Sequence, residues 1–156
     1  MATVIETQIT IGATAERVWA VLTDFTAYAR WNPFILRAEG TPEAGGRMTV
    51  QVARPRGRTR VFRPMVLMVA APSQLRWLAR LWLPGLLDVE HAFLIENDNG
   101  SGAVRLVQRA RVEGFVALCL RRRLESELYG SFEAMNHALK RRVEQASGPS
   151  GRTGAG

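Results

Sequence analysis

Six short segments of alternating apolar and polar residues follow one another between residues 34 and 114, and they limit the folds open to this chain. An apolar residue at every second position is typical of a strand with one buried face. Short connections rich in glycine, proline, asparagine and serine separate the segments, which favours antiparallel pairing of neighbours in a meander. The predicted strands are 35–40, 46–54, 59–71, 74–83, 86–98 and 103–114.

The segment before this meander predicts one further strand and two short helices. Residues 3–11 alternate in the same way, which brings the predicted strands to seven. Thr14 suits the N-cap of a first helix, and Asp24 suits the N-cap of a second. The second helix is expected to end at Asn32-Pro33, because a proline disfavours helical backbone at the residue before it.

After the last strand, the spacing of apolar residues changes to that of a helix. Between residues 124 and 143 they recur at steps of three or four, with charged residues on much of the opposite face. This amphipathic helix is the only predicted element large enough to cover the apolar face of the sheet. The sequence therefore predicts an α+β fold, with a curved seven-stranded antiparallel sheet wrapped around a long C-terminal helix. The apolar stripe of the helix consists of Leu124, Leu128, Phe132, Met135 and Leu139.

The order of these elements and two local motifs resemble a known superfamily. Residues 13–34, ATAERVWAVLTDFTAYARWNPF, resemble its opening helices with their tryptophan–asparagine–proline turn. Residues 75–115 resemble the tryptophan strand, glycine turn and histidine-bearing strand of one bacterial branch. The resemblance to the START-like, Bet v 1-like helix-grip superfamily (SRPBCC, polyketide cyclase/dehydrase-like proteins) spans residues 3–145. It implies a helix-grip fold and a cavity for apolar small molecules, but no single reaction.

The domain is predicted to cover residues 1–146, followed by a disordered tail. Residues 147–156 are rich in glycine and serine and lack the apolar side chains that would bury surface.

Strand alternation and the helix stripe predict which side chains face the interior. Two polar residues, His91 and Gln108, stand among apolar ones, which is the usual composition of a small-molecule site. Trp31 and Phe34, at the bend that follows the second helix, are expected either to plug one end of the cavity or to act as a lid. The predicted ligand-binding residues are Trp31, Phe34, Met48, Val50, Val52, Trp77, His91, Phe93, Leu106, Gln108, Leu124, Leu128, Phe132 and Met135.

His91 is the only candidate for general acid–base catalysis in the predicted interior. The unperturbed pKa of histidine, about 6.5, suits proton transfer at neutral pH. Its neighbour Glu90 points to the other face of the strand, so the two do not form an acid–base pair. His91 is thus a candidate catalytic residue, and the alternative is a hydrogen-bonded structural histidine.

The chain carries 21 lysine and arginine residues against 14 acidic ones, which gives a net charge of +7. No recognition helix, zinc finger or RNA-binding motif accompanies them, so no nucleic-acid partner is expected. Residues 114–123, GFVALCLRRR, combine an apolar run with three arginines. This stretch suits either peripheral contact with an anionic membrane or packing beneath the sheet as the start of the long helix.

The remaining chemistry of the chain is sparse. A single cysteine, Cys119, excludes an internal disulfide framework and fits a cytoplasmic location. Together with His91 and His137 it cannot assemble a structural zinc motif. No phosphate-binding glycine loop occurs either, so neither a metal nor a cofactor is expected.

Three functions are left open by the sequence. The preferred one is binding of a hydrophobic, lipid-like or polyketide-like small molecule in the cavity. The second is catalysis of the polyketide cyclase or dehydratase type, with His91 as acid or base. The third is a basic interaction module that docks a partner or an anionic membrane. The sequence fits a monomer and a homodimer equally.

Overall fold

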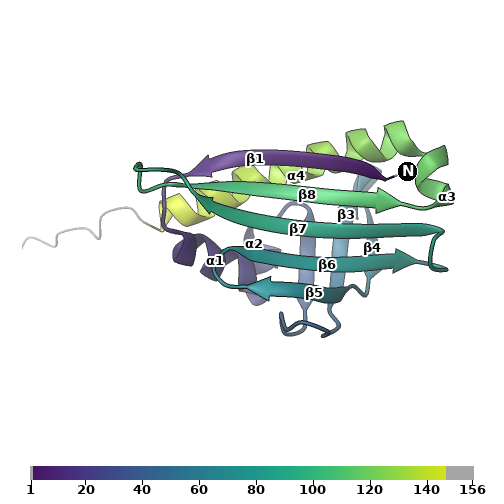
Figure 1. The fold of residues 1–156 in the computed structure, drawn as a ribbon, viewed down its shortest axis with the longest axis horizontal. Helices are drawn as coiled ribbons and strands as arrows, with labels where there is room; N and C mark the ends of the chain where they lie inside the picture. Colours follow the sequence, from purple (N-terminus) through teal and green to yellow (C-terminus); the bar gives the residue numbers. More distant parts are fainter. Residues whose placement is uncertain (1, 147–156) are drawn as a thin grey trace, which may run out of the picture.

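A computed structural model describes residues 2–146 of the chain, and the tail predicted at 147–156 lies outside them. The elements follow the predicted order of strand, short helices, meander and long helix (Figure 1). They are β1 (Thr3–Ile11), α1 (Ala15–Thr23), the 3₁₀ turn η1 (Phe25–Ala27), α2 (Tyr28–Trp31), β2 (Ile35–Glu39), β3 (Thr49–Arg54), the 3₁₀ turn η2 (Pro55–Gly57), β4 (Arg58–Phe62), β5 (Met65–Ala70), β6 (Gln74–Leu81), β7 (Leu87–Asn97), β8 (Val104–Glu113), α3 (Phe115–Cys119) and α4 (Arg121–Gln145).

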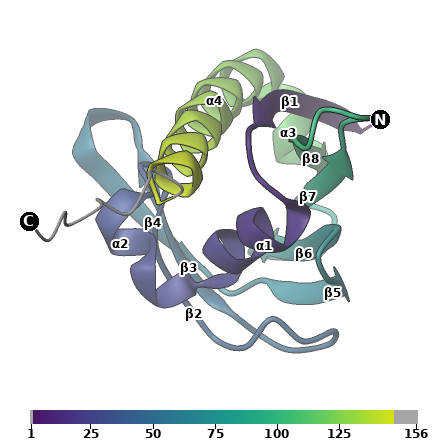
Figure 2. The ribbon, with the colours of Figure 1, turned by 90° about the vertical axis from the view of Figure 1, so that its left-hand side faces the viewer.

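The strands form two antiparallel sheets that grip the long helix. One has the order β1-β8-β7-β6-β5, and the other has the order β2-β3-β4. Seen end-on in Figure 2, the sheets stand on either side of α1, and α4 lies across the space between them. The predicted α+β helix-grip architecture is confirmed.

The predicted strand at 59–71 is in fact two strands, so residues 2–146 form eight strands where seven were predicted. β4 ends at Phe62 and β5 begins at Met65, and the two belong to different sheets. Pro64 lies between them, and it has no N–H for a continuous ladder. Its carbonyl instead accepts a hydrogen bond from Met48 N at 2.9 Å, beside an isolated bridge between Arg47 and Met65.

The helix α4 begins at Arg121 rather than at residue 124. Arg121 and Arg123 pair with Glu125 and Glu127, one turn further along, at 2.8 and 2.7 Å. Such i,i+4 pairs stabilise the first turns of a helix. The spacing of apolar residues, from which the helix was predicted, does not reveal them. At its other end α4 is tied to the chain before α1, where Gly12 N donates to the side chain of Glu144 at 2.9 Å.

The N-terminal helices agree with the sequence in two of three details. The hydroxyl of Thr14 caps α1 by accepting from Arg17 N at 3.4 Å, as predicted. Asp24 does not cap the second helix, because its carboxylate accepts from the Thr26 hydroxyl at 2.6 Å and makes no capping bond to backbone. The second helix consists of η1 followed by α2, and it ends at Asn32 before the proline, as predicted.

Candidate functional site

An apolar cavity of about 620 Å³ lies between the two sheets and the first half of α4. Its size falls within the range of small-molecule sites, about 300–1,000 Å³. The strands contribute side chains from both sheets, because alternation turns every second residue of each strand toward the space they enclose. The strand wall includes Val50, Val52, Phe62, Trp77, Val89 and His91.

The helical wall comes from successive turns of α4 and from the residue that precedes it. Leu120, Leu124, Leu128 and Phe132 are spaced by four residues, so they lie on one side of the helix and line the cavity. Six lining residues are exposed to solvent, namely Pro33, Pro55, Trp82, Leu120, Gly130 and Ala134. We call the part of the lining formed by Pro55, Trp82 and Leu120 the mouth of the cavity.

The bend after α2 explains why large aromatic residues stand beside a proline. Asn32 is buried, and its side-chain oxygen accepts hydrogen bonds from Phe34 N at 3.0 Å and Ile35 N at 2.9 Å. These bonds fix the turn and direct Phe34 into the cavity, where its ring packs against Phe132 at a centroid distance of 5.7 Å. Trp31 instead packs edge-on against the buried Tyr28, at 5.1 Å.

His91 lies in the cavity wall within a group of aromatic rings. Its ring stacks on Phe132 at 4.8 Å and lies 4.5 Å from Phe93, and the Trp77 ring meets it edge-on at 5.4 Å. Among residues 2–146 its polar contact is with Gln108, whose amide nitrogen lies 2.9 Å from His91 Nε2. The same amide nitrogen also lies 3.6 Å from the sulfur of Met135.

These surroundings keep the imidazole uncharged. Burial lowers the pKa of His91 to about 3, because the imidazolium loses its hydration and gains no carboxylate in exchange. A neutral imidazole with so low a pKa is a weak general base at neutral pH. His91 is therefore arranged as a hydrogen-bonded histidine, which adds a polar atom to the apolar wall of the cavity.

The comparisons with known proteins agree with this fold. Residues 2–144 match the model of a protein family described as "Polyketide cyclase / dehydrase and lipid transport". The chain belongs to this family. The comparison with curated protein sequences gives no match.

Solved structures share the fold at low sequence identity. A START superfamily protein from Mycobacterium smegmatis is 22% identical, with 92% of this chain and 98% of that chain covered and a TM-score of 0.70. The Zhui aromatase/cyclase from Streptomyces sp. R1128 is 18% identical, with 97% and 99% covered and a TM-score of 0.77. A point mutant of norcoclaurine synthase from Thalictrum flavum is 12% identical, with 94% and 97% covered and a TM-score of 0.72.

Eight of the predicted ligand-binding residues line the cavity of this polyketide cyclase/dehydrase family member. Their role as ligand contacts stays a prediction, because their position shows only that a ligand in the cavity would meet them. They are Phe34, Val50, Val52, Trp77, His91, Leu124, Leu128 and Phe132.

The remaining six predicted residues lie outside the cavity lining. Five are fully buried in the packed core, and Trp31 is half-buried beside it. The alternation of a strand tells which face a side chain is on, but not how near the opposite wall comes at that point. His91 and Phe93 share a face of β7, yet only His91 borders the open space. The six are Trp31, Met48, Phe93, Leu106, Gln108 and Met135.

Sequence reasoning missed lining residues at the mouth and beside it. Arg54 and Arg60 continue the inward face of β3 and β4 beyond Val52 and Phe62, so strand alternation could have found them. Trp82 could not have been found in this way. Its backbone adopts a φ of 63°, which bulky residues rarely do, and this places it in the lining together with its neighbour Leu81.

A second buried polar pair was also missed. Asn136, on the inner side of α4, donates to the Thr7 hydroxyl of β1 at 2.8 Å, and both side chains are buried. Asparagine within a helix gives no sequence signal that distinguishes a buried position from a solvated one.

The described residues hold few groups for metal or redox chemistry. Among residues 2–146 no three His, Cys, Asp or Glu side chains come together in a way that could hold a metal ion. Within that same range, none of the helices has the length and apolar character needed to cross a membrane. Cys119 is exposed, and His137 lies on the outer side of α4, 3.7 Å from Glu133.

Proposed function

We propose that this protein binds a hydrophobic small molecule, lipid-like or polyketide-like, in the cavity between the sheets and α4. The observation that carries the proposal is the cavity itself, which is walled mainly by apolar side chains. Burying about 200 Å² of apolar ligand surface contributes about 5 kcal/mol, before the cost of association is subtracted. The family description names lipid transport and polyketide chemistry, which supports a ligand of this class.

His91 supplies the polar contact in this proposal. With the Gln108 amide donating to Nε2, the ring proton is on Nδ1, and this N–H is the donor that remains for a ligand. The lowered pKa of His91 argues for a neutral donor rather than for proton transfer. We therefore place hydrophobic ligand binding ahead of cyclase or dehydratase catalysis.

A variant that fills the cavity tests the proposal. Ala79 lines the cavity from β6, and Ala79→Phe would place a ring in the space that a ligand needs. We expect the affinity for N-phenyl-1-naphthylamine, a neutral apolar fluorescent probe, to fall at least about tenfold. Val61→Phe is the matched control, because Val61 is exposed on β4 and lies outside the lining.

Equal probe binding by Ala79→Phe and the wild type would contradict the proposal, as would a wild type that binds no apolar probe. Native mass spectrometry of the purified wild type adds an independent readout. We expect a co-purified apolar compound that is absent from Ala79→Phe.

A second candidate function, docking on an anionic membrane, is favoured by the surface around the mouth. Four large apolar side chains, which we call the apolar rim, are about two-thirds exposed there: Trp82 (65%), Leu83 (69%), Phe115 (69%) and Leu118 (68%). The β6–β7 loop and α3 that carry them are joined by a hydrogen bond from Val116 N to Leu86 O at 3.0 Å. Figure 1 shows both at the same end of the molecule.

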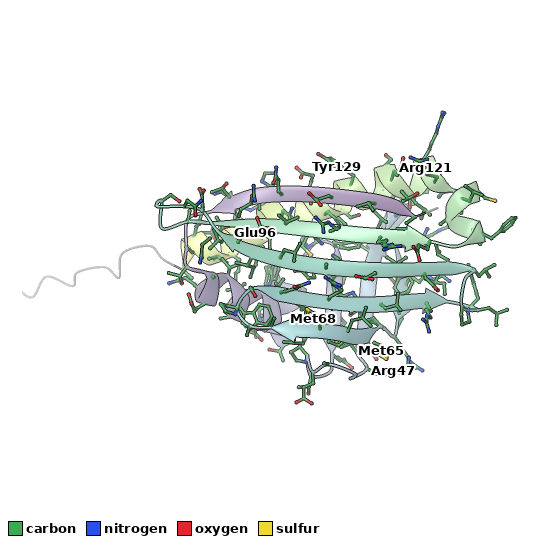
Figure 3. The ribbon with its side chains drawn as sticks, in the orientation of Figure 1. Arg47, Met65, Met68, Glu96, Arg121 and Tyr129 are labelled. Atoms are coloured by element: carbon green, nitrogen blue, oxygen red, sulfur yellow. The ribbon has the colours of Figure 1, made fainter. Side chains whose placement is uncertain are left out.

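Arginines 121–123 follow the apolar rim in sequence, and Arg121 projects outward from the start of α4 (Figure 3). Apolar side chains beside cationic ones suit the interface of a bilayer with anionic head groups. We propose that the apolar rim inserts there and brings the mouth to the membrane surface.

Vesicle co-sedimentation tests this docking. We expect binding to phosphatidylglycerol vesicles, little binding to phosphatidylcholine vesicles, and a loss of several-fold in Phe115→Ser/Leu118→Ser. Tyr129→Ser is the control, because Tyr129 is exposed on α4 outside the apolar rim (Figure 3). Binding that ignores both lipid charge and the double substitution would contradict the docking proposal.

A further inference from the structure

A second hollow, of about 530 Å³, adjoins the mouth and is lined mainly by arginine. We call it the arginine groove. Arg54, Pro55 and Arg60 line both the groove and the apolar cavity, so the two spaces adjoin each other. The guanidinium groups of the groove belong to Arg54, Arg56, Arg58, Arg60 and Arg123.

The groove continues one face of the β3–β4 hairpin. Val50 is paired with Phe62, Val52 with Arg60, and Arg54 with Arg58, so these six side chains share one face of the ladder. Along this face the side chains change from apolar, inside the cavity, to cationic at the end of the hairpin. A molecule lying along it would meet apolar surface first and guanidinium groups last.

The arrangement of these arginines is unfavourable without an anion. Arg54 and Arg58 stand directly opposite each other, and like charges in that position destabilise a strand pair. Between them, Arg56 adopts a left-handed backbone with φ of 62°, which is uncommon for a residue other than glycine. Backbone strain of this kind concentrates at ligand sites.

The groove also has too few carboxylates to neutralise it. Within residues 2–146, the acidic residue that pairs with arginines of the groove is Glu127, at 2.7 Å from Arg123 and 3.8 Å from Arg54. Arg60 lies over the rings of Trp82 and Phe62, at 4.9 and 5.6 Å. Over residues 2–146, the side chains of Arg56, Arg58 and Arg60 have no carboxylate partner. The groove therefore keeps an excess of positive charge beside a cavity of low polarity, where charge interactions are strong.

From these observations we infer that the ligand is an amphipathic anion: an apolar body in the cavity and one oxyanion group, carboxylate or phosphate, in the arginine groove. Arginine is suited to this role because its planar fork donates two parallel hydrogen bonds to such a group. The inference rests on the proposed function, since it assumes that the cavity holds the apolar part.

The test compares ligands that differ only in the head group. N-phenyl-1-naphthylamine is bound in the cavity and then displaced by dodecan-1-ol, dodecanoate or dodecyl phosphate, near neutral pH and at low ionic strength. We expect the two anions to displace the probe at concentrations at least about tenfold lower than the alcohol. This advantage should shrink as salt is added. The order of the two anions identifies whether the groove prefers a carboxylate or a phosphate.

Arg58→Gln removes one charge from the groove, and Arg37→Gln is its matched control. Arg37 is exposed on β2 and lines neither space, and its substitution lowers the net charge by the same amount. We expect Arg58→Gln to lose several-fold in affinity for the anions and to keep its affinity for the alcohol and the probe. Arg37→Gln should behave like the wild type.

The possible failures can be told apart. If the probe binds but the alcohol and the anions compete equally well, the oxyanion site is wrong and the apolar site stands. Equal losses in Arg58→Gln and Arg37→Gln would show an effect of overall charge, which also overturns the oxyanion site. A wild type that does not bind the probe overturns both the apolar site and the oxyanion site.

Discussion

The two halves of α4 carry the same apolar stripe but have opposite surroundings. In the C-terminal half, Met135, Leu139 and Val143 are completely buried against the core. In the N-terminal half, Leu124 and Leu128 are only half-buried and face the cavity. A continuous stripe therefore says that one side of a helix is shielded from water, and not whether that side meets protein or an open space.

The difference arises from what lies opposite each half. The C-terminal half packs along β1 and is held there by two polar contacts: Lys140 Nζ donates to Thr10 O at 2.8 Å, and Asn136 bonds to Thr7. The N-terminal half faces the space where the three-stranded sheet diverges from the five-stranded one (Figure 2). Phe132 stands at the boundary, stacked on His91.

Leucine truncation in each half should show the largest contrast. Leu139→Ala removes side-chain atoms from a closed core, and we expect a loss of about 3 kcal/mol or more in the free energy of unfolding. Leu128→Ala removes the same atoms from a side chain that already borders a cavity, so its cost should be about 1 kcal/mol or less. Urea unfolding curves measure both. Equal costs would mean that the cavity is closed around Leu128.

The pH dependence of stability should report the burial of His91 at the boundary. Its pKa is about 3 in the folded state and about 6.5 in the unfolded chain, so acidification protonates the unfolded state first. Stability is then lost as the pH falls below about 6.5, by about 2 kcal/mol between about pH 7 and about pH 5.

The comparison with His91→Phe isolates this contribution from that of the carboxylates. We expect the difference in unfolding free energy between wild type and variant to change over that pH range. A constant difference would show that His91 takes up its proton in the folded protein as readily as in the unfolded one.

The buried Asn136–Thr7 pair should give the smallest effect. Asn136→Leu leaves the Thr7 hydroxyl buried without its donor, and we expect a cost of about 1 kcal/mol in the free energy of unfolding. The double variant Thr7→Val/Asn136→Leu should recover most of it, because two apolar groups then meet. Denaturant unfolding of the single and double variants forms the cycle, and additive losses would refute the coupling.

Much of the fold was predictable because it depends on local patterns. Period-two alternation located the strands, and the spacing of Leu124, Leu128 and Phe132 located α4. The Thr14 cap and the Asn32 turn also follow from local chemistry. The division at Pro64 was overlooked, although the proline is a visible interruption.

The candidate site was only partly predictable. His91, Trp77 and Val52 lie in the cavity wall, as their strand faces suggested, whereas Gln108 and Leu106 are enclosed in the core. The mouth depends on the left-handed backbone of Trp82, and the arginine groove depends on the pairing of Arg54 with Arg58. Neither feature is encoded by hydrophobic periodicity.

By itself, the sequence determined which side chains avoid water and the order of strands and helices, because burial and turn formation act over a few neighbouring residues. The tertiary structure alone decided where the two sheets part, and so which buried side chains border a hollow. That outcome depends on the distances between segments that are far apart in the chain. A pattern of residues along the sequence does not contain those distances.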